Sequence, residues 1–515
     1  VARPTEKWTN LQEGHELYCA GHMIEAAVAY YEATGKTELL TIVKKNVDLI
    51  YHRFVEEGRE GVPGHPEIEL ALVRLYRVTK EKKYLELAKH FIDARGQDRE
   101  LFVREKKARS WTSWNSDPYD TDYTQNSHPV REETNAVGHA VRALYLCTGM
   151  AMTAAETKDK TLVDACKKWW NSVTKKRMYI TGGVGNSAPG EAFTEDYFLP
   201  NDLAYNETCA SIALIFFARE MAAITNDASY VDVMERALYN TVLASMQLDG
   251  KHFFYTNPLE VNPNYAHIVP VLNHVYPRRP KWHGCACCPP NAARLITSLD
   301  RYTWHQSNGI FYSDLMIGGT YRPEEGIEIE VESSYVKDGQ VTYHIRKEND
   351  KSINLAIRVP AWSKETKIEV NGVTQQVKLE HGYQLFSKLE SGTVIHMQFD
   401  FTPHKIYANP NVAADLGKCA IVAGPFTYCF EDTDNKVDVN RLFINALAEP
   451  IAQEITDTTL GETRKVTIPG YYYEETEALY LEKRPKARAI VLTAVPYYAW
   501  GNRSEGSMKV WLPEK

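Results

Sequence analysis

Three cysteines stand within four positions of the segment "HGCACCPPNAAR" (283–294): Cys285, Cys287 and Cys288. Such a cluster can form a disulfide, bind a metal ion or supply a nucleophilic thiolate. Two prolines and an apolar helical pattern follow directly. Because three thiols beside two prolines are poor packing material, the cluster predicts chemistry rather than a role in a core.

A second segment, "NETCAS" (206–211), adds a carboxylate and a thiol, Glu207 and Cys209, at the expected start of a long helix. With the cluster they supply three thiolates and one carboxylate, and sulfur-rich tetrahedral sites favour zinc. Spacing alone leaves a structural zinc clip, a redox centre and a functional zinc site open. The long separation between the two segments, in a domain large enough to fold without metal, favours the functional site.

The loop before this helix, "RMYITGGVGNSAPGEAFTEDYFLPND" (177–202), is rich in glycine and acids. Its glycines resemble a dinucleotide-binding loop, but "APG" stands where a helix would have to begin, so that interpretation is rejected. The acids of the loop are Glu191, Glu195 and Asp196. Acids on such a loop are typical of a carbohydrate site, where a carboxylic acid protonates the departing oxygen.

Three histidines each follow a glycine in an apolar helical context: His22, His65 and His139. Any one alone is more often a hydrogen-bonded core histidine. Because they lie on different hairpins, the three together predict side chains that converge on one axis and bind sugar hydroxyls. Tyr255 and Glu235 are further candidates, with aromatic packing and a helix-face ion pair as the respective alternatives.

A scaffold must position these residues. The pattern of residues 12–300 predicts helical hairpins whose connecting turns repeat one sequence motif. Its four copies are "TGKTELL" (34–40), "TKEKKYL" (79–85), "TKDKTLV" (157–163) and "TNDASYV" (225–231). Helix pairs with long loops between them are typical of a barrel with an inner and an outer ring of helices. The sequence predicts about nine helices, whereas a closed ring of six helix pairs needs twelve. We therefore expect that a preceding segment supplies the others.

Beyond Trp304 the pattern changes to short segments in which apolar and polar residues alternate, separated by Gly, Asn-Gly or Asp-Gly turns. This alternation predicts antiparallel β-sandwiches. We therefore expect a helical domain over 1–304, a sandwich over 305–408 that is completed by a strand in 505–515, and a second sandwich over 409–504.

The composition excludes several classes of protein. The 515 residues are 44% hydrophobic and 24% charged, which are ordinary values for a chain that folds without disulfide bonds or structural metal ions. A net charge of -8 without long like-charge runs argues against nucleic acid or an anionic membrane as partner. The longest apolar stretch, "ASIALIFFA" (210–218), is too short to span a membrane. The nine cysteines are odd in number and, apart from the cluster, scattered along the chain, which predicts a reducing, cytoplasmic location rather than a disulfide framework.

Taken together, five motifs resemble glycoside hydrolase family 127, the β-L-arabinofuranosidases. They are "GEAF" (190–193), "NETCAS", "CACCPPNAAR" (285–294), "HPVREETNAVGHAVRALYL" (128–146) and "PGHPEIELAL" (63–72). The motifs support the resemblance over residues 12–305. The remainder agrees with the family only in being rich in predicted β-strands. It implies an (α/α)6 barrel with β-sandwich domains, retaining hydrolysis at a zinc-bound cysteine, an oligosaccharide with terminal L-arabinofuranose as substrate, and a homodimer.

The resemblance also implies roles for individual residues. Cys287 would be nucleophile and zinc ligand, with Cys288, Cys209 and Glu207 completing the metal site and Cys285 nearby without ligating. Glu191 would be the general acid/base. The sugar would contact His22, His65, His139, Tyr255 and, as a weaker candidate, Glu235; His15 lies close enough in sequence to replace His22.

Physical chemistry supports this assignment. Retention requires a nucleophile on one face of the anomeric carbon and an acid on the other, and a coordinated thiol is deprotonated at neutral pH. Two alternatives remain at this point: a carboxylate pair made of Glu191 with Glu195 or Asp196, with zinc as a structural ion, and a carbohydrate-binding protein without catalysis.

Overall fold

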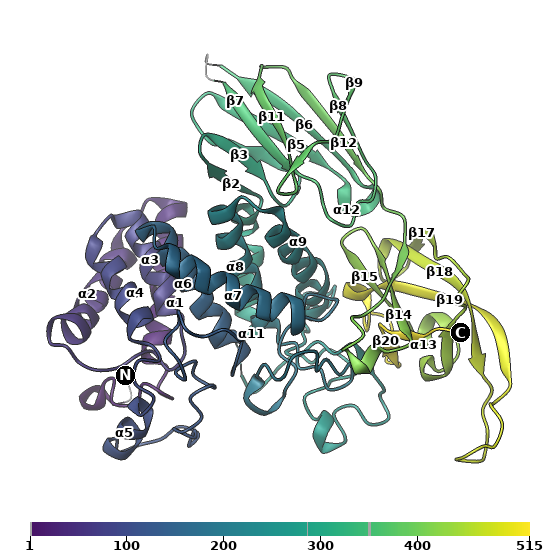
Figure 1. Cartoon of the computed structure of the whole chain (residues 1–515), viewed down its shortest axis with the longest axis horizontal. Coiled ribbons are helices and arrows are strands. Elements are labelled where there is room, and N and C mark those ends of the chain that lie inside the picture. Colours follow the sequence, from purple (N-terminus) through teal and green to yellow (C-terminus); the bar gives the residue numbers. More distant parts are fainter. Residues whose placement is uncertain (1–2, 286, 349–351) are drawn as a thin grey trace. The chain divides into compact units, whose positions relative to one another are not determined.

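The structure, a computed structural model, describes residues 3–285, 287–348 and 352–515 (Figure 1). The chain divides into two compact units. Unit 1 holds residues 1–178 and 184–196, and unit 2 holds 179–183 and 197–515. Unit 1 is helical, whereas unit 2 begins with helices and continues into sheets in which nearly all strand pairs are antiparallel. The predicted fold class, helices followed by antiparallel β domains, is confirmed.

Unit 1 is built from helical hairpins. Their helices are α1 (Glu16–Thr34) with α2 (Glu38–Tyr51), α3 (Ile68–Thr79) with α4 (Lys82–Ala94), and α6 (Ala140–Thr157) with α7 (Lys160–Lys176). Helix α3 packs against both α1 and α6, so the first helices of the three hairpins form one row. The short α5 (Leu101–Ala108) follows α4. Helix α6 is buried over most of its length, as expected for an inner helix.

The repeated turn has one local structure in all four copies. A threonine ends the first helix, and its hydroxyl donates to the carbonyl four residues earlier: Thr34, Thr79, Thr157 and Thr225. The next residue is left-handed, with φ between 53° and 70°: Gly35, Lys80, Lys158 and Asn226. Its backbone N–H closes the helix end, so the chain can turn into the next helix.

The helices of unit 2 begin with α8 (Thr208–Thr225) and α9 (Ala228–Ala237), the fourth hairpin. Helix α8 is long and apolar enough to span a membrane, but 78% of it is buried inside the protein, as in a core helix. A π-helical turn (Leu238–Val242) and α10 (Leu243–Ser245) continue α9. Helix α11 (Cys288–Ile296) packs against α8.

A β-sandwich follows the helices. One sheet has the strand order β4 (Gly319–Tyr321), β5 (Ile327–Ser333), β6 (Gln340–Lys347), β12 (Val394–Phe399), β8 (Thr366–Val370), β9 (Val373–Gln375). The other has the order β10 (Leu379–Glu380), β11 (Tyr383–Leu389), β7 (Ile353–Arg358), β3 (Ile310–Ser313), β2 (Trp304–Ser307). Apolar residues of both sheets share one buried core. Strands β3 and β7 pair in parallel, unlike the antiparallel pairs expected.

The C-terminal sheet continues from β13 (His404–Ile406) to β21 (Leu512–Pro513). Its other strands are β14 (Lys418–Ala423), β15 (Phe426–Glu431), β16 (Leu442–Ile444), β17 (Ile451–Asp457), β18 (Gly461–Tyr473), β19 (Ala487–Pro496) and β20 (Met508–Lys509). Strand β1 (Glu260–Val261), from the helical segment, adds to one edge through β20. Short helices α12 (Tyr335–Asp338) and α13 (Asp432–Asn435) lie in loops of the two β domains.

The prediction that 505–515 completes the sandwich over 305–408 is wrong. Strand β20 pairs with β1 and β15, and β21 pairs with β14, so the end of the chain belongs to the C-terminal sheet. Met508 and Leu512 are buried in the cores of that domain. The alternating pattern predicts a strand correctly, but it carries no information about which sheet the strand joins.

Candidate functional site

Three thiols and a carboxylate meet at the N-terminal ends of α8 and α11 in unit 2. Glu207 directly precedes α8, and Cys209 lies in its first turn. Cys287 directly precedes α11, and Cys288 is its first residue. The structure therefore brings together the four residues predicted as metal ligands.

Backbone pairing fixes the position of this thiol cluster. The N–H of Thr208 donates to the carbonyl of Tyr255 at 2.9 Å, and the Thr208 hydroxyl donates to the carbonyl of Phe254 at 3.0 Å. The side chain of Asn257 donates to the carbonyl of Asn206 and to the Thr208 hydroxyl, both at 3.0 Å. The start of α8 and the segment around Tyr255 are therefore held side by side.

The distances within the thiol cluster fit one tetrahedral metal ion. The Cys287 sulfur lies 3.7 Å from the Cys209 sulfur and 3.7 Å from the Cys288 sulfur. Glu207 Oε1 lies 3.8 Å from the Cys287 sulfur and 3.7 Å from the Cys288 sulfur. A tetrahedral ion with zinc-like bond lengths separates two sulfur ligands by about 3.8 Å, and a sulfur from an oxygen by about 3.6 Å.

Charge also favours a cation at this point. Hydrogen bonds with Cys287 and Cys288 lower the pKa of the Cys209 thiol to about 7, whereas burial raises the pKa of the Cys288 thiol well above its ordinary value. Thiolates this close together repel one another, so a cation between them would be needed to hold several at once. The positive ends of two helix dipoles at the cluster stabilise those thiolates.

Only one of the grouped thiols is accessible. Cys209 and Cys288 are 3% and 1% exposed, whereas Cys287 is half-buried and the hydroxyl oxygen of Tyr255 lies 3.2 Å from its sulfur. Cys285 is exposed and lies outside the group. Among the four candidate ligands, Cys287 is the one that a substrate can reach.

The predicted histidines lie together in unit 1, around His65. The His65 ring lies 5.6 Å from that of His139, 5.6 Å from that of His15 and 4.4 Å from that of Tyr18, centroid to centroid. His22 lies 4.4 Å from Tyr18, and its Nδ1 is 3.2 Å from Glu67 Oε1. His15 and His22 therefore both belong to this histidine cluster.

A tight loop brings Glu191 to the same cluster. Gly190 and Glu191 are both left-handed, with φ of 75° and 50°, which is strained for a glutamate. The loop closes through hydrogen bonds between Ser187 and Ala192, and the N–H of Phe193 donates to the carbonyl of Gly138 at 2.9 Å. As a result, Glu191 Oε2 lies 2.8 Å from Nε2 of His139.

The hydrogen bonds of His139 define its tautomer. It caps α6, and its Nδ1 accepts from the N–H groups of Val141 and Arg142. The proton of a neutral ring is therefore on Nε2, which donates it to Glu191. Burial lowers the pKa of His139, which favours this neutral form.

Two other predicted acids are engaged elsewhere. Both carboxylate oxygens of Glu235 accept hydrogen bonds, one from Arg358 and one from the Trp362 indole, so the structure places this candidate sugar ligand in a buried ion pair. Asp196 accepts a hydrogen bond from Lys176 and forms an ion pair with Arg177, each at 2.7 Å.

Sequence reasoning missed several members of the histidine cluster. Tyr18 packs between His22 and His65, and its spacing of four residues from His22 on α1 was an available signal. The buried Arg142 stacks over Tyr123 at 4.3 Å. Trp114, 46% exposed, packs edge-on against His15. Tyr123 and Trp114 come from the irregular segment between α5 and α6, and no pattern in the sequence marks them.

Comparison with known proteins gives a consistent picture. Residues 1–301 match the family profile described as β-L-arabinofuranosidase, GH127 catalytic domain, residues 311–401 match the GH127 middle domain, and residues 403–513 match the glycoside hydrolase family 127 C-terminal domain. A non-reducing end β-L-arabinofuranosidase of Bifidobacterium longum is 38% identical over 98% of this chain and 79% of its own length.

Solved structures agree. A GH127 β-L-arabinofuranosidase from Geobacillus stearothermophilus T6 is 43% identical and superposes with a TM-score of 0.95, covering 100% of this chain and 82% of its own. A second GH127 β-arabinofuranosidase is 34% identical, with a TM-score of 0.87 over 100% of this chain and 79% of its own.

Proposed function

Because the chain belongs to glycoside hydrolase family 127, we propose that it is a zinc-dependent, retaining exo-glycosidase that releases terminal β-L-arabinofuranose through a cysteine nucleophile. The observation that carries the proposal is the thiol cluster, in which one accessible thiol stands among four donors spaced for a single metal ion. The names of the relatives supply the sugar and the exo mode of action.

The metal would be held by Glu207, Cys209, Cys287 and Cys288. Sulfur-rich tetrahedral donor sets select zinc over harder divalent ions. When bound, zinc supplies the deprotonation of a thiol that would otherwise be mostly protonated at neutral pH.

In the first half of the reaction, the Cys287 thiolate attacks the anomeric carbon of the terminal sugar. The bond between this carbon and the glycosidic oxygen breaks, and Glu191 donates its proton to the departing oxygen. The products are a thioglycosyl-enzyme and the shortened glycan. Because only a carboxylic acid can donate this proton, Glu191 must be protonated when the substrate binds.

In the second half, the Glu191 carboxylate takes a proton from water as the water oxygen attacks the anomeric carbon. The carbon–sulfur bond breaks, and the Cys287 thiolate and free arabinose are released. Two inversions at one carbon give net retention. The hydrogen bond from neutral His139 holds the carboxylate of Glu191 in a fixed position for both steps.

The histidine cluster is suited to bind the sugar. Neutral imidazoles and the phenol of Tyr18 offer donors and acceptors for hydroxyl groups. We assign His22 and His65 to this role, with Tyr255 beside the nucleophile. His139 was predicted to bind sugar as well, but the start of α6 and Glu191 already engage both of its ring nitrogens, so its role is to position Glu191. A cytoplasmic location belongs to the same proposal, since a catalytic thiolate requires a compartment where thiols stay reduced.

The test combines two variants with an aryl β-L-arabinofuranoside and a mechanism-based inhibitor. The inhibitor should label Cys287 in the wild-type enzyme. Cys287→Ser should abolish both this labelling and turnover. Glu191→Gln should slow hydrolysis by about 10²- to 10⁴-fold while leaving inhibitor labelling possible when the leaving group needs no acid.

Two results would overturn this mechanism. Labelling of Glu195 or Asp196, with near-normal rates for Cys287→Ser, would favour the carboxylate pair with zinc as a structural ion. Sugar binding without hydrolysis of any aryl arabinofuranoside would identify a carbohydrate-binding protein. The ion pairs of Asp196 with Lys176 and Arg177 support the cysteine mechanism, because they leave this carboxylate poorly placed to act as a nucleophile.

A further inference from the structure

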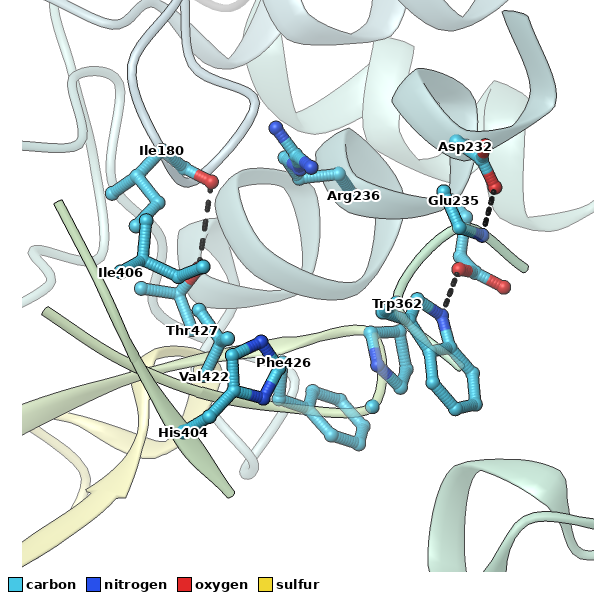
Figure 2. Close-up of a pocket in the computed structure, with 13 residues that line it drawn as sticks. Ile180, Asp232, Glu235, Arg236, Trp362, His404, Ile406, Val422, Phe426 and Thr427 are labelled. Carbon is cyan, nitrogen blue, oxygen red and sulfur yellow. Dashed lines mark hydrogen bonds between the residues drawn. The ribbon is translucent and has the colours of Figure 1, made fainter. Parts of the chain in front are cut away.

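A cavity of about 220 Å³ lies in unit 2 beside α9, away from the residues of the thiol cluster (Figure 2). Its walls come from α9, from the segment that follows β7, and from strands β13 to β15. Junctions of several domains are common positions for small-molecule sites. None of the residues to which the proposed reaction assigns a chemical step lines this cavity.

Arg236 supplies a cation to the cavity. Within the part of the chain that the structure describes, its guanidinium makes no hydrogen bond and no ion pair. The neighbouring carboxylates are committed to Arg358: Asp232 accepts from it at 2.7 Å, and Glu235 accepts from it and from Trp362 at the other oxygen. In Figure 2 the guanidinium of Arg236 points toward Ile180, away from the side on which Asp232 and Glu235 lie.

The environment of Arg236 makes this free charge unusual. The side chain is exposed to the cavity, yet protein surrounds it closely enough that burial lowers the pKa of its guanidinium, and the nearby Asp232 and Glu235 offset this only in part. The guanidinium is a charged donor on the cavity wall with no protein acceptor among the described residues. An oxyanion bound in the cavity would supply that acceptor.

The remaining walls favour a small ligand with an apolar side. Phe426, Ile406 and Val422 line the cavity together with the Trp362 indole (Figure 2). His404 also faces the cavity; its Nδ1 lies 3.2 Å from the carbonyl of Thr402, so a neutral ring carries its proton there and leaves Nε2 for a ligand.

We propose that this cavity binds a small oxyanion, a carboxylate or a phosphate, with Arg236 as its anchor. The planar guanidinium offers paired donors that match both groups. A sugar acid would place its ring against the aromatic and aliphatic wall, and a phosphate would use Arg236 with His404. The site is separate from the proposed glycosidase reaction, and neither depends on the other.

Calorimetric titration of the whole protein with inorganic phosphate and with D-galacturonate, at constant ionic strength, tests the proposal. Saturable binding of one or both probes is expected, and the probe that binds identifies the source of the oxyanion. Arg236→Gln should weaken that binding by about tenfold or more, because a charge-assisted pair is lost. Arg278→Gln is the matched control: Arg278 is exposed, does not line the cavity, and lies 3.8 Å from Glu505.

Val422→Phe provides an independent check should Arg236→Gln fold poorly. It fills the cavity without removing a charge, and it should abolish binding while aryl arabinofuranoside hydrolysis continues. The proposal is wrong if neither probe binds saturably to the wild-type protein, if Arg236→Gln or Val422→Phe binds as tightly as wild type, or if neutral D-galactose binds as tightly as D-galacturonate.

Discussion

Nε2 of His139 lies 2.8 Å from Oε2 of Glu191, and the direction of this hydrogen bond is fixed by the other side of the ring. Nδ1 accepts from the first N–H groups of α6, so a neutral His139 has its proton on Nε2. His139 thus caps the N-terminal end of α6 and also orients the proposed acid. The two tasks can be separated by mutation.

We expect His139→Asn to keep the helix cap, because Asn is among the best capping residues, and to lose the contact with Glu191, because its side chain is shorter. His139→Ala should lose both. Hydrolysis should fall by about ten- to hundredfold in each variant, the worth of a hydrogen bond to a charged group. Only the Ala variant should also lose about 1 kcal/mol of stability.

Steady-state rates over a range of pH, together with urea unfolding, would check this pair. A hydrogen bond from His139 favours the carboxylate form of its partner, so its loss should move the alkaline limb of the rate profile to higher pH. An unchanged profile in both variants would mean that His139 acts only as a cap.

Metal removal should affect activity and stability together. Chelation is expected to abolish hydrolysis, lower the midpoint of thermal unfolding and make Cys287 reactive toward a thiol reagent, since the half-buried thiol loses its ligand. Addition of zinc should reverse all three changes. Metal analysis should find one zinc ion per chain in the wild-type enzyme and little in Cys209→Ala. A chelated enzyme with full activity would exclude a role for metal in the reaction.

Local patterns predicted much of this fold. Each copy of the repeated Thr turn ends a helix. The threonine hydroxyl binds the last turn, and the left-handed residue after it redirects the chain into the next helix. Alternation predicted the strands equally well. The pairing of residues 508–513 could not be predicted, since the choice of sheet depends on distant residues.

In the candidate site, too, local sequence predicted some residues correctly and failed for others. The four grouped donors follow from residue types and spacing, because thiols and a carboxylate at two helix ends have few other uses. Glu235 shows the limit of that reasoning: its partner Arg358 lies 123 residues away in another domain, and no local pattern reveals the pair.

The ion pair between Glu235 and Arg358 gives a prediction of its own. Arg358 is fully buried, so Arg358→Met should cost about 3–5 kcal/mol by leaving the buried carboxylates without their cation. The double variant Glu235→Leu/Arg358→Met should recover part of that loss in urea unfolding. If Glu235 instead contacts sugar, Glu235→Gln should raise KM strongly with little change in stability; we expect the reverse.

Glu105 should make the stability of the protein depend on pH. Burial raises the pKa of this carboxyl from 4.5 to about 7, although the N–H groups of Leu11 and Gln12 donate to it. A folded-state pKa above the unfolded value means that the contribution of Glu105 to stability is full below the unfolded pKa and is lost as pH rises through the folded one.

The free energy of unfolding of wild type relative to Glu105→Gln should therefore fall by about 3 kcal/mol between about pH 4 and pH 8. Urea unfolding at intervals across this range measures the difference. Glu60→Gln is the matched control, since the Glu60 side chain is 79% exposed and should show no such trend. A constant difference between wild type and Glu105→Gln would mean that Glu105 stays charged in the folded protein, with its two backbone donors outweighing the cost of burial.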